Sequence, residues 1–222
     1  PASLQLRAPL LDPHHTSACR LFNGFTEGDP RFAVDLYART LVVHQREDAP
    51  EALQSLLETI RAHLPWVRAC VVKRRFEKKP ELKRGVLAFG DPSLVDKRVS
   101  EHGVGYAVRL TMQQDASLYL DTRELRSWLK ANSQGKRVLN CFAYTGSLGV
   151  AAAAGGASRV VQTGILDEAV DLESADLLVE GVEELLAGSG AGVGGAVLEG
   201  AAESPKGEHA FVGSVERHAH AV

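Results

Sequence analysis

The sequence predicts an α/β protein, with a small mixed α+β region first and the start of a larger sheet after it. The main observation is a short apolar strand over 137–140, a turn ending at Gly146 and an alanine-rich helix from Ser147. A second strand follows over 159–163 and completes a strand–helix–strand unit, which builds open sheets with parallel strands. Residues 19–100 hold short strands and one amphipathic helix, a pattern typical of an α+β arrangement.

The composition fits a globular protein of one large or two small domains. The chain has 222 residues, 45% of them hydrophobic, and a formal net charge of -3. The net charge of the whole chain therefore does not indicate binding to nucleic acid, and any RNA-binding face must be local. No secretory signal opens the chain, and no uninterrupted apolar run reaches membrane-spanning length, so no membrane partner is expected.

Cysteine and histidine usage indicates neither a metal site nor a disulfide framework. Cys19, Cys70 and Cys141 lie far apart and form no C-x-x-C pair, which favours a reducing, cytoplasmic compartment. Cys141 follows a predicted strand and is expected to pack as a small hydrophobic residue, not to act as a nucleophile. None of the eight histidines has metal-ligand spacing, so no metal is expected.

The elements of the first half follow from alternation and helical spacing. After a loose lead-in over 1–18, strands are predicted over 32–37 and 40–44, with a turn at Gly28-Asp29-Pro30 before them. A helix begins after Ala49 and ends before Pro65, and a strand follows over 66–73. The apolar face of that helix consists of Leu53, Leu56, Leu57, Ile60 and Leu64.

The second half contains one more strand and a helix before the glycine unit. A strand is predicted over 106–110. Asp121 is the expected N-cap of the next helix, because Glu124 three residues later has the spacing of a capping box. Leu125, Trp128 and Leu129 give this helix one apolar face, and the helix ends at 132–135.

A basic stretch lies between the two halves and has two interpretations. It contains Phe76 and a run of cations, namely Lys73, Arg74, Arg75, Lys78, Lys79, Lys83 and Arg84. A charge run of this kind is typical of a solvated loop, since it specifies nothing by itself. The functional alternative is a surface that contacts RNA phosphates.

The strand–glycine–helix unit indicates a nucleotide-like ligand. This geometry brings backbone N–H groups and a helix N-terminus toward such a ligand. A glycine at 146 leaves room beside the backbone. The G-x-G-x-x-G spacing is missing, which disfavours a nicotinamide-dependent oxidoreductase.

The run Asn-Cys-Phe-Ala-Tyr-Thr-Gly at 140–146 resembles the first cofactor motif of the S-adenosylmethionine (SAM) dependent methyltransferases that modify large-subunit rRNA. Two further stretches extend the resemblance. One is the turn over 28–30 with Val-Asp-Leu-Tyr at 34–37, and the other joins Glu-His-Gly-Val-Gly-Tyr at 101–106 to 118–126. Together they cover roughly residues 20–163.

The resemblance implies SAM as cofactor, a Rossmann-like sheet and large-subunit rRNA as partner, with cytosine at carbon 5 or guanine as the methylated base. An arginine can hold the methionine carboxylate of SAM in a bidentate manner, although Arg123 and Arg126 are also typical of a surface ion-pair set with Glu124. The implied cofactor-binding residues are Asp121, Arg123, Arg126, Asn140, Phe142, Tyr144, Thr145 and Gly146.

The resemblance breaks after the second strand of the unit. The family places an acidic residue there for the ribose, where this chain has Gly164, and the nearest acids are Asp167 and Glu168. The family's catalytic Pro-Pro element is missing, since the only proline after Gly146 is Pro205, and no catalytic residue is assigned. We therefore hypothesise that the family sequence stops near Thr163, and that 164–222 is an out-of-frame or unrelated tail, rich in Gly, Ala and Glu and poorly ordered.

Four segments follow from these observations: a lead-in over 1–18, an RNA-side α+β domain over 19–100, an incomplete SAM-binding domain over 101–163 and the tail over 164–222. The favoured function is SAM-dependent methylation of a base in large-subunit rRNA, by a chain that lacks the base-activating half. A non-catalytic RNA-binding module, a nicotinamide-dependent oxidoreductase and a partly folded inert chain remain alternatives.

Overall fold

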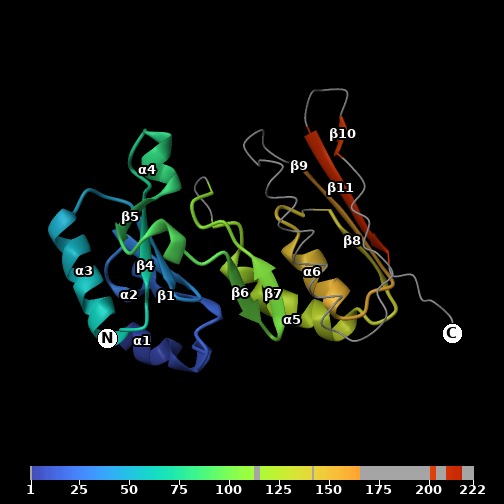
Figure 1. Ribbon diagram of the computed structural model, residues 1–222, viewed down its shortest axis with the longest axis horizontal. Helices are drawn as coiled ribbons and strands as arrows, with labels where there is room; N and C mark the ends of the chain where they lie inside the picture. Colours follow the sequence, from blue (N-terminus) through green and yellow to red (C-terminus); the bar gives the residue numbers. More distant parts are fainter. Residues whose placement is uncertain (1, 113–115, 142, 166–200, 204–208, 217–222) are drawn as a thin grey trace. The chain divides into compact units, whose positions relative to one another are not determined.

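The computed structural model describes residues 2–112, 116–141, 143–165, 201–203 and 209–216 (Figure 1). The chain divides into two compact units. Unit 1 consists of residues 1–100 and 108–120, and unit 2 consists of residues 101–107 and 121–222. The predicted α/β class is confirmed, because both units combine a sheet with helices.

Unit 1 is built on one five-stranded sheet in the order β1-β2-β3-β4-β5. Strands β1 to β3 are antiparallel neighbours, β3 and β4 are parallel, and β5 returns antiparallel to β4. The hairpin of β2 and β3 is the pair predicted from alternation, and β4 begins three residues later than the predicted strand. The bounds are β1 Ala18–Asn23, β2 Phe32–Tyr37, β3 Thr40–Gln45, β4 Ala69–Arg74 and β5 Val86–Phe89.

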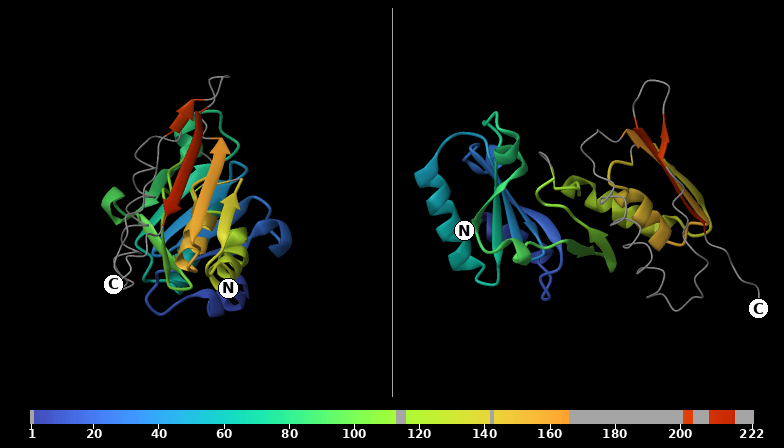
Figure 2. Two further views of the ribbon diagram at one scale, coloured as in Figure 1. Left: turned by 90° about the vertical axis from the view of Figure 1, so that its right-hand side faces the viewer. Right: turned by 45° about the horizontal axis from the view of Figure 1, so that its top comes forward.

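Helix α3 (Pro50–His63) makes the crossover between the parallel strands β3 and β4. It lies along one face of the sheet (Figure 2), with Pro50 in its first turn and Glu51 near its positive end. Its apolar face packs on the strand residues that point to the same side, among them Phe32 and Leu41. Burial raises the pKa of Cys70, in this core, to about 12, so the thiol stays neutral.

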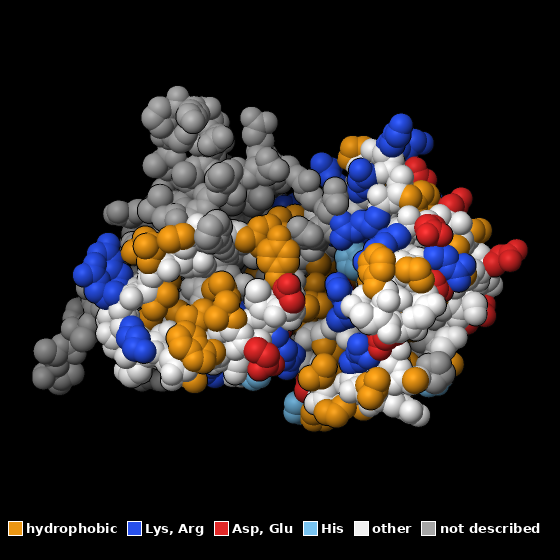
Figure 3. Space-filling view, turned by 180° about the vertical axis from the view of Figure 1, so that it is seen from behind, with side chains coloured by type: hydrophobic (Ala, Val, Ile, Leu, Met, Phe, Trp, Pro, Cys, Tyr) orange, Lys and Arg blue, Asp and Glu red, His pale blue; other side chains and the backbone are white. Residues whose placement is uncertain are grey.

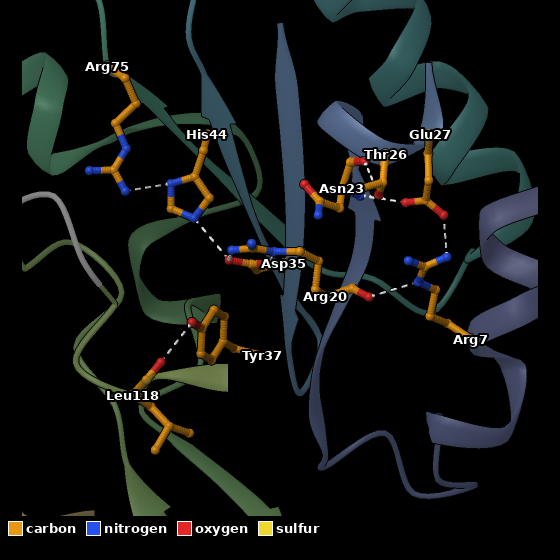
Figure 4. Close-up of polar contacts among 10 residues, drawn as sticks. All are labelled: Arg7, Arg20, Asn23, Thr26, Glu27, Asp35, Tyr37, His44, Arg75 and Leu118. Carbon is orange, nitrogen blue, oxygen red and sulfur yellow. Dashed lines mark hydrogen bonds and ion pairs between the residues drawn. The ribbon is translucent and has the colours of Figure 1, made fainter. Parts of the chain in front are cut away.

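Short helices complete unit 1. The bounds are α1 Ala2–Arg7, η1 Ala8–Leu10, α2 Gly24–Glu27, α4 Pro80–Arg84 and η2 Pro92–Leu94. The predicted lead-in contains α1, and Leu4 and Leu11 pack against the core of the sheet. Arg7 pairs with Glu27 and donates from Nε to the carbonyl of Arg20 at 3.2 Å, so this segment is fixed to the sheet (Figure 4).

The second face of the unit 1 sheet is polar, because the strand residues that alternate with the core residues include Arg20, Asp35, His44 and Lys73. Residues 108–120 return to unit 1 after the excursion into unit 2. Lys73 Nζ donates to the carbonyl of Met112 at 3.0 Å, and the Tyr37 hydroxyl donates to the carbonyl of Leu118 at 3.2 Å. The returning segment therefore accepts hydrogen bonds from this face.

Unit 2 contains the glycine unit. Its sheet has the order β10-β11-β9-β8, with β8 and β9 parallel and β11 antiparallel to β9 and β10. Helix α6 lies against β8 and β9, and α5 packs on α6. The bounds are β8 Arg137–Asn140, α6 Ser147–Ala154, β9 Arg159–Ile165, β10 Ala201–Glu203 and β11 His209–Glu216.

A hairpin and two helical segments precede that sheet. Strands β6 (Arg98–Glu101) and β7 (Val104–Ala107) form a two-stranded sheet, so the strand predicted over 106–110 ends earlier. The segment η3 (Leu120–Thr122) then leads into α5 (Arg123–Asn132). The capping-box prediction is wrong: Asp121 lies inside the 3-10 turn, Thr122 is the N-cap, and no side chain caps the helix.

Two sequence-based expectations about burial are also wrong. Leu125 and Trp128 are 44% and 58% exposed, because the side of α5 that is turned inward carries Arg126 instead. Cys141 is exposed, since the chain leaves the sheet directly after β8.

Most of the predicted tail, including 166–200 and 204–208, lies outside the described residues. Its described residues are Gly164 and Ile165 at the end of β9 and the strands β10 and β11, which continue the sheet beyond β9. No helix in the described part of the chain is long and apolar enough to cross a membrane.

Truncating Leu41 to Ala tests the core of unit 1. Leu41 is fully buried between α3 and the sheet, so the free energy of unfolding should fall by about 2–5 kcal/mol. The matched control is Leu6→Ala, because Leu6 is 74% exposed on α1 and its loss should change little. Urea unfolding followed by circular dichroism measures both variants, and equal losses would contradict this account of the core.

Candidate functional site

The loop between β8 and α6 has the backbone geometry that the glycine unit predicts. Two of its residues have positive φ angles, Tyr144 at 49° and Gly146 at 82°. The amide of Gly146 donates to the carbonyl of Ala143 at 2.7 Å, which closes a tight turn. Helix α6 begins at the next residue, so the N–H groups of its first turn, which have no acceptor within the helix, lie beside this loop.

A polar pair lies under the loop. Asn140 ends β8 and Gln162 is its register partner on β9. Asn140 Nδ2 donates to Gln162 Oε1 at 3.2 Å, and Gln162 is buried. A Cβ added at Gly146 would lie 3.0 Å from Gln162 Nε2, so the loop approaches this amide as closely as a glycine allows. Gln162 was missed by sequence reasoning, although its register with Asn140 follows from the two predicted parallel strands.

The start of α5 carries two of the predicted cofactor-binding side chains. Asp121 is exposed in the turn η3. The Arg123 side chain is 19% exposed, and its Nη1 lies 3.9 Å from a carboxylate oxygen of Glu101. Both remain candidates for the polar ends of SAM.

Arg126, the third predicted residue of this segment, is held by a buried carboxylate. Its Nε and Nη2 donate to the two oxygens of Glu101 at 2.7 and 2.9 Å, and both side chains are 0% exposed. Its Nη1 donates to the Thr122 hydroxyl at 2.7 Å. The guanidinium also lies 5.5 Å from the ring centroid of Tyr106, and burial raises the pKa of that phenol.

The arrangement around Arg126 joins the β6–β7 hairpin to the first turn of α5. The structure thus differs from the expectation of a solvent-facing arginine, because Arg126 is enclosed and Glu101 occupies its bidentate face. Sequence reasoning gave Glu101 no site role, since its partner lies 25 residues further along the chain.

The remaining cofactor candidates are placed as follows. Thr145 and Gly146 are buried in the loop and Tyr144 is half-buried. Phe142, Asp167 and Glu168 lie outside the described residues. Gly164 is part of β9, so within the described strand no acid stands at the position expected for a ribose contact. The described residues contain no group of three or more His, Cys, Asp or Glu side chains that could hold a metal ion.

The basic stretch does not form one surface. Lys73 departs from the expectation, because it is buried and its ammonium donates to Met112. Arg74 and Arg75 are half-buried, while Lys78 and Lys79 are exposed in the loop before α4, which carries Lys83 and Arg84. Figure 3 shows Lys and Arg side chains gathered over part of unit 1, on the right of that view.

Comparisons with known proteins agree with the resemblance of the strand–glycine–helix unit to SAM-dependent methyltransferases. A family model described as S-adenosylmethionine-dependent methyltransferase matches residues 20–176. The ribosomal RNA large subunit methyltransferase I of Aeromonas salmonicida is 30% identical over 185 residues, which are 80% of this chain and 46% of the relative. The enzyme of the same name from Escherichia coli is 33% identical over 159 residues, or 69% of this chain and 39% of the relative.

A third relative, the ribosomal RNA large subunit methyltransferase K/L of Hahella chejuensis, is 35% identical over 57% of this chain and 18% of its own length. The chain therefore spans less than half the length of these curated relatives. Among solved structures, a candidate SAM-dependent methyltransferase from Streptococcus mutans gives a TM-score of 0.68 at 24% identity, over 82% of this chain and 46% of that one. A methyltransferase solved with SAH gives 0.69 over the same shares. At this identity the likeness shows the fold alone.

Removing the positive partner of Glu101 tests the buried ion pair. Arg126→Met leaves the enclosed carboxylate without the cation that donates to both of its oxygens, so the free energy of unfolding should fall by about 3–5 kcal/mol in urea titrations. The double variant Glu101→Leu/Arg126→Met removes both charges and should recover much of that loss. Arg123→Met is the control, because Arg123 is partly exposed and 3.9 Å from Glu101. A double variant as unstable as Arg126→Met would contradict the argument.

Proposed function

The chain belongs to the S-adenosylmethionine-dependent methyltransferase family, and we propose that it binds SAM at the loop between β8 and α6 and serves the methylation of a base in large-subunit rRNA. The observation that carries the proposal is the turn at Gly146, with its φ of 82° directly before the first N–H groups of α6. Three named relatives are large-subunit rRNA methyltransferases, which supports the RNA substrate.

The residues of this site fit the chemistry of SAM. The cofactor carries an adenosine, a carboxylate and an ammonium, and when bound it supplies an activated methyl group. Arg123 is suited to the carboxylate, because a guanidinium binds it through two parallel hydrogen bonds. Asp121 is exposed in the same segment and can accept from the ammonium. Asn140, Tyr144, Thr145 and Gly146 line the loop, and their task is to orient the cofactor, since orientation supplies much of the rate of a displacement.

Arg126 has a different task in this proposal. Its guanidinium donates three hydrogen bonds to Glu101 and Thr122, so it fixes the segment that carries Asp121 and Arg123. Phe142 remains a proposed wall of the pocket from the resemblance alone. A base stacked in RNA must be turned out before it reaches a methyl donor. The described residues offer no group that we assign to activation of that base, which is cytosine or guanine in this proposal.

A non-catalytic RNA-binding role is the second candidate. It is favoured by the exposed cations Lys78, Lys79 and Arg84, which belong to unit 1, whereas the proposed cofactor loop belongs to unit 2. Binding through phosphate contacts releases counter-ions and weakens steeply as salt rises. A titration of the chain with large-subunit rRNA fragments at several salt concentrations tests this role, and binding that ignores salt argues against it.

A pair of glycine variants tests the cofactor site. Gly146→Ala and Gly135→Ala both place a side chain at a positive φ, 82° and 69°, and each pays about 1 kcal/mol of strain. Only Gly146 lies in the proposed pocket, whereas a Cβ at Gly135 meets nothing within 4 Å. Isothermal titration with SAM should show about tenfold weaker binding for Gly146→Ala and little change for Gly135→Ala. NADH is the control ligand. Absence of SAM binding by the unaltered chain, or binding of NADH instead, overturns the cofactor proposal.

A further inference from the structure

A chain of four side chains crosses the polar face of the unit 1 sheet (Figure 4). Arg20 of β1 donates from Nε and Nη2 to the two oxygens of Asp35 on β2, at 2.7 and 3.1 Å. His44 of β3 lies 3.0 Å from Asp35 through its Nε2. Arg75, just after β4, lies 2.9 Å from His44 Nδ1 through its Nη2. Arg20 and Arg75 thus approach the His44–Asp35 pair from its two ends.

The direction of these hydrogen bonds fixes the form of His44. An arginine has only donors, so Nδ1 must accept from Arg75 and carry no proton. The ring proton then lies on Nε2, which donates to the carboxylate of Asp35. A neutral imidazole with this tautomer is the form that satisfies both neighbours at once.

Burial and charge agree with this form. Burial of His44 lowers its pKa; the contact with Asp35 opposes that shift, and the charges of Arg75 and Lys73 reinforce it. Burial acts to raise the pKa of Asp35, but hydrogen bonds from His44 and Arg20 outweigh it and hold the pKa below its usual range. Asp35 is therefore an anion that orients His44, and His44 offers its other nitrogen to Arg75.

We propose that His44, held by Asp35, is a positioning residue that orients the guanidinium of Arg75 to bind a backbone phosphate of the RNA substrate. The inference rests on the proposed function, because that function supplies the RNA. A guanidinium presents a flat fork of donors that matches phosphate oxygens, and fixing its plane beforehand lowers the ordering cost of binding.

The surroundings of Arg75 are positively charged. Arg75 is half-buried and stands at the start of the exposed loop that carries Lys78 and Lys79. On the other side of the network, burial and the charge of Arg20 together lower the pKa of Arg46. A phosphate that enters this region meets a field of the right sign.

Two substitutions of His44 separate positioning from a general structural role. His44→Asn places an amide oxygen near the position of Nδ1, so it keeps an acceptor for Arg75. His44→Gln places an amide nitrogen near the position of Nε2, so it keeps a donor for Asp35 and lacks that acceptor. His63→Gln is the matched control, because His63 is exposed on α3 and contacts only the Thr59 carbonyl among the contacts described for it. Circular dichroism and urea midpoints verify that each variant folds.

Binding of a fluorescently labelled RNA hairpin to the full chain is the readout. We expect His44→Gln and Arg75→Lys to bind about tenfold more weakly, the usual effect of losing one charge-assisted hydrogen bond, and His44→Asn and His63→Gln to bind within about twofold of the unaltered chain. Long-range proton–nitrogen spectra of the unaltered chain should also show His44 Nε2 protonated and Nδ1 unprotonated, a measurement that needs no RNA.

Several results would overturn the inference. Equal weakening by His44→Asn and His44→Gln with lowered urea midpoints would make His44 merely structural, and unchanged binding by His44→Gln would remove its role. A proton on Nδ1 would contradict the tautomer. Tight binding of inorganic phosphate without binding of the hairpin would remove RNA as the ligand. Failure of the unaltered chain to bind the hairpin would refute the RNA partner as well, while SAM titration judges the cofactor proposal separately.

Discussion

A carboxylate buried in the middle of a sheet must be paired, and Asp35 imposes that requirement on unit 1. Taking a carboxylate out of water costs several kcal/mol unless charge and hydrogen bonds replace the solvent. Arg20 and His44 meet this need from the two neighbouring strands, so the register of β1, β2 and β3 is tied to one polar cluster. A slip of one residue between these strands would turn Asp35 toward the apolar core under α3. Because the charged side chains must lie on one face of the sheet, the apolar core must lie on the opposite face.

In unit 2, too, a buried carboxylate is paired with a cation. Glu101 is enclosed at the end of β6, and Arg126 reaches it from the first turn of α5. The pair ties a hairpin to a helix, although its two residues are 25 positions apart in the sequence. Such pairs contribute little net stability compared with apolar contacts, but they allow few alternative arrangements. In the proposed SAM site, a fixed position of Arg123 is more useful than additional stability.

The sequence predicted the elements whose signals are local. The β2–β3 hairpin follows from period-two alternation, α3 from apolar spacing between Pro50 and Pro65, and the turn at Gly146 from the strand–glycine–helix pattern. Features that depend on distant residues were missed. Arg126 was expected to bind a ligand, because no nearby sequence signal indicates its pairing with Glu101. Lys73 was expected at the surface, because no local pattern predicts that residues 108–120 return to unit 1. The capping box failed because Asp121 belongs to a 3-10 turn, a choice that spacing alone does not reveal.

The discontinuity of unit 1 has a consequence for the order in which the chain folds during synthesis. All five strands of its sheet have been translated by Phe89. Lys73 and Tyr37 donate to the carbonyls of Met112 and Leu118. These two residues leave the ribosome later, after the whole β6–β7 hairpin has emerged. The nascent sheet must therefore keep its polar face hydrated while part of the neighbouring unit is already being made. Completion of the first unit is thus delayed until a piece of the second has been synthesised.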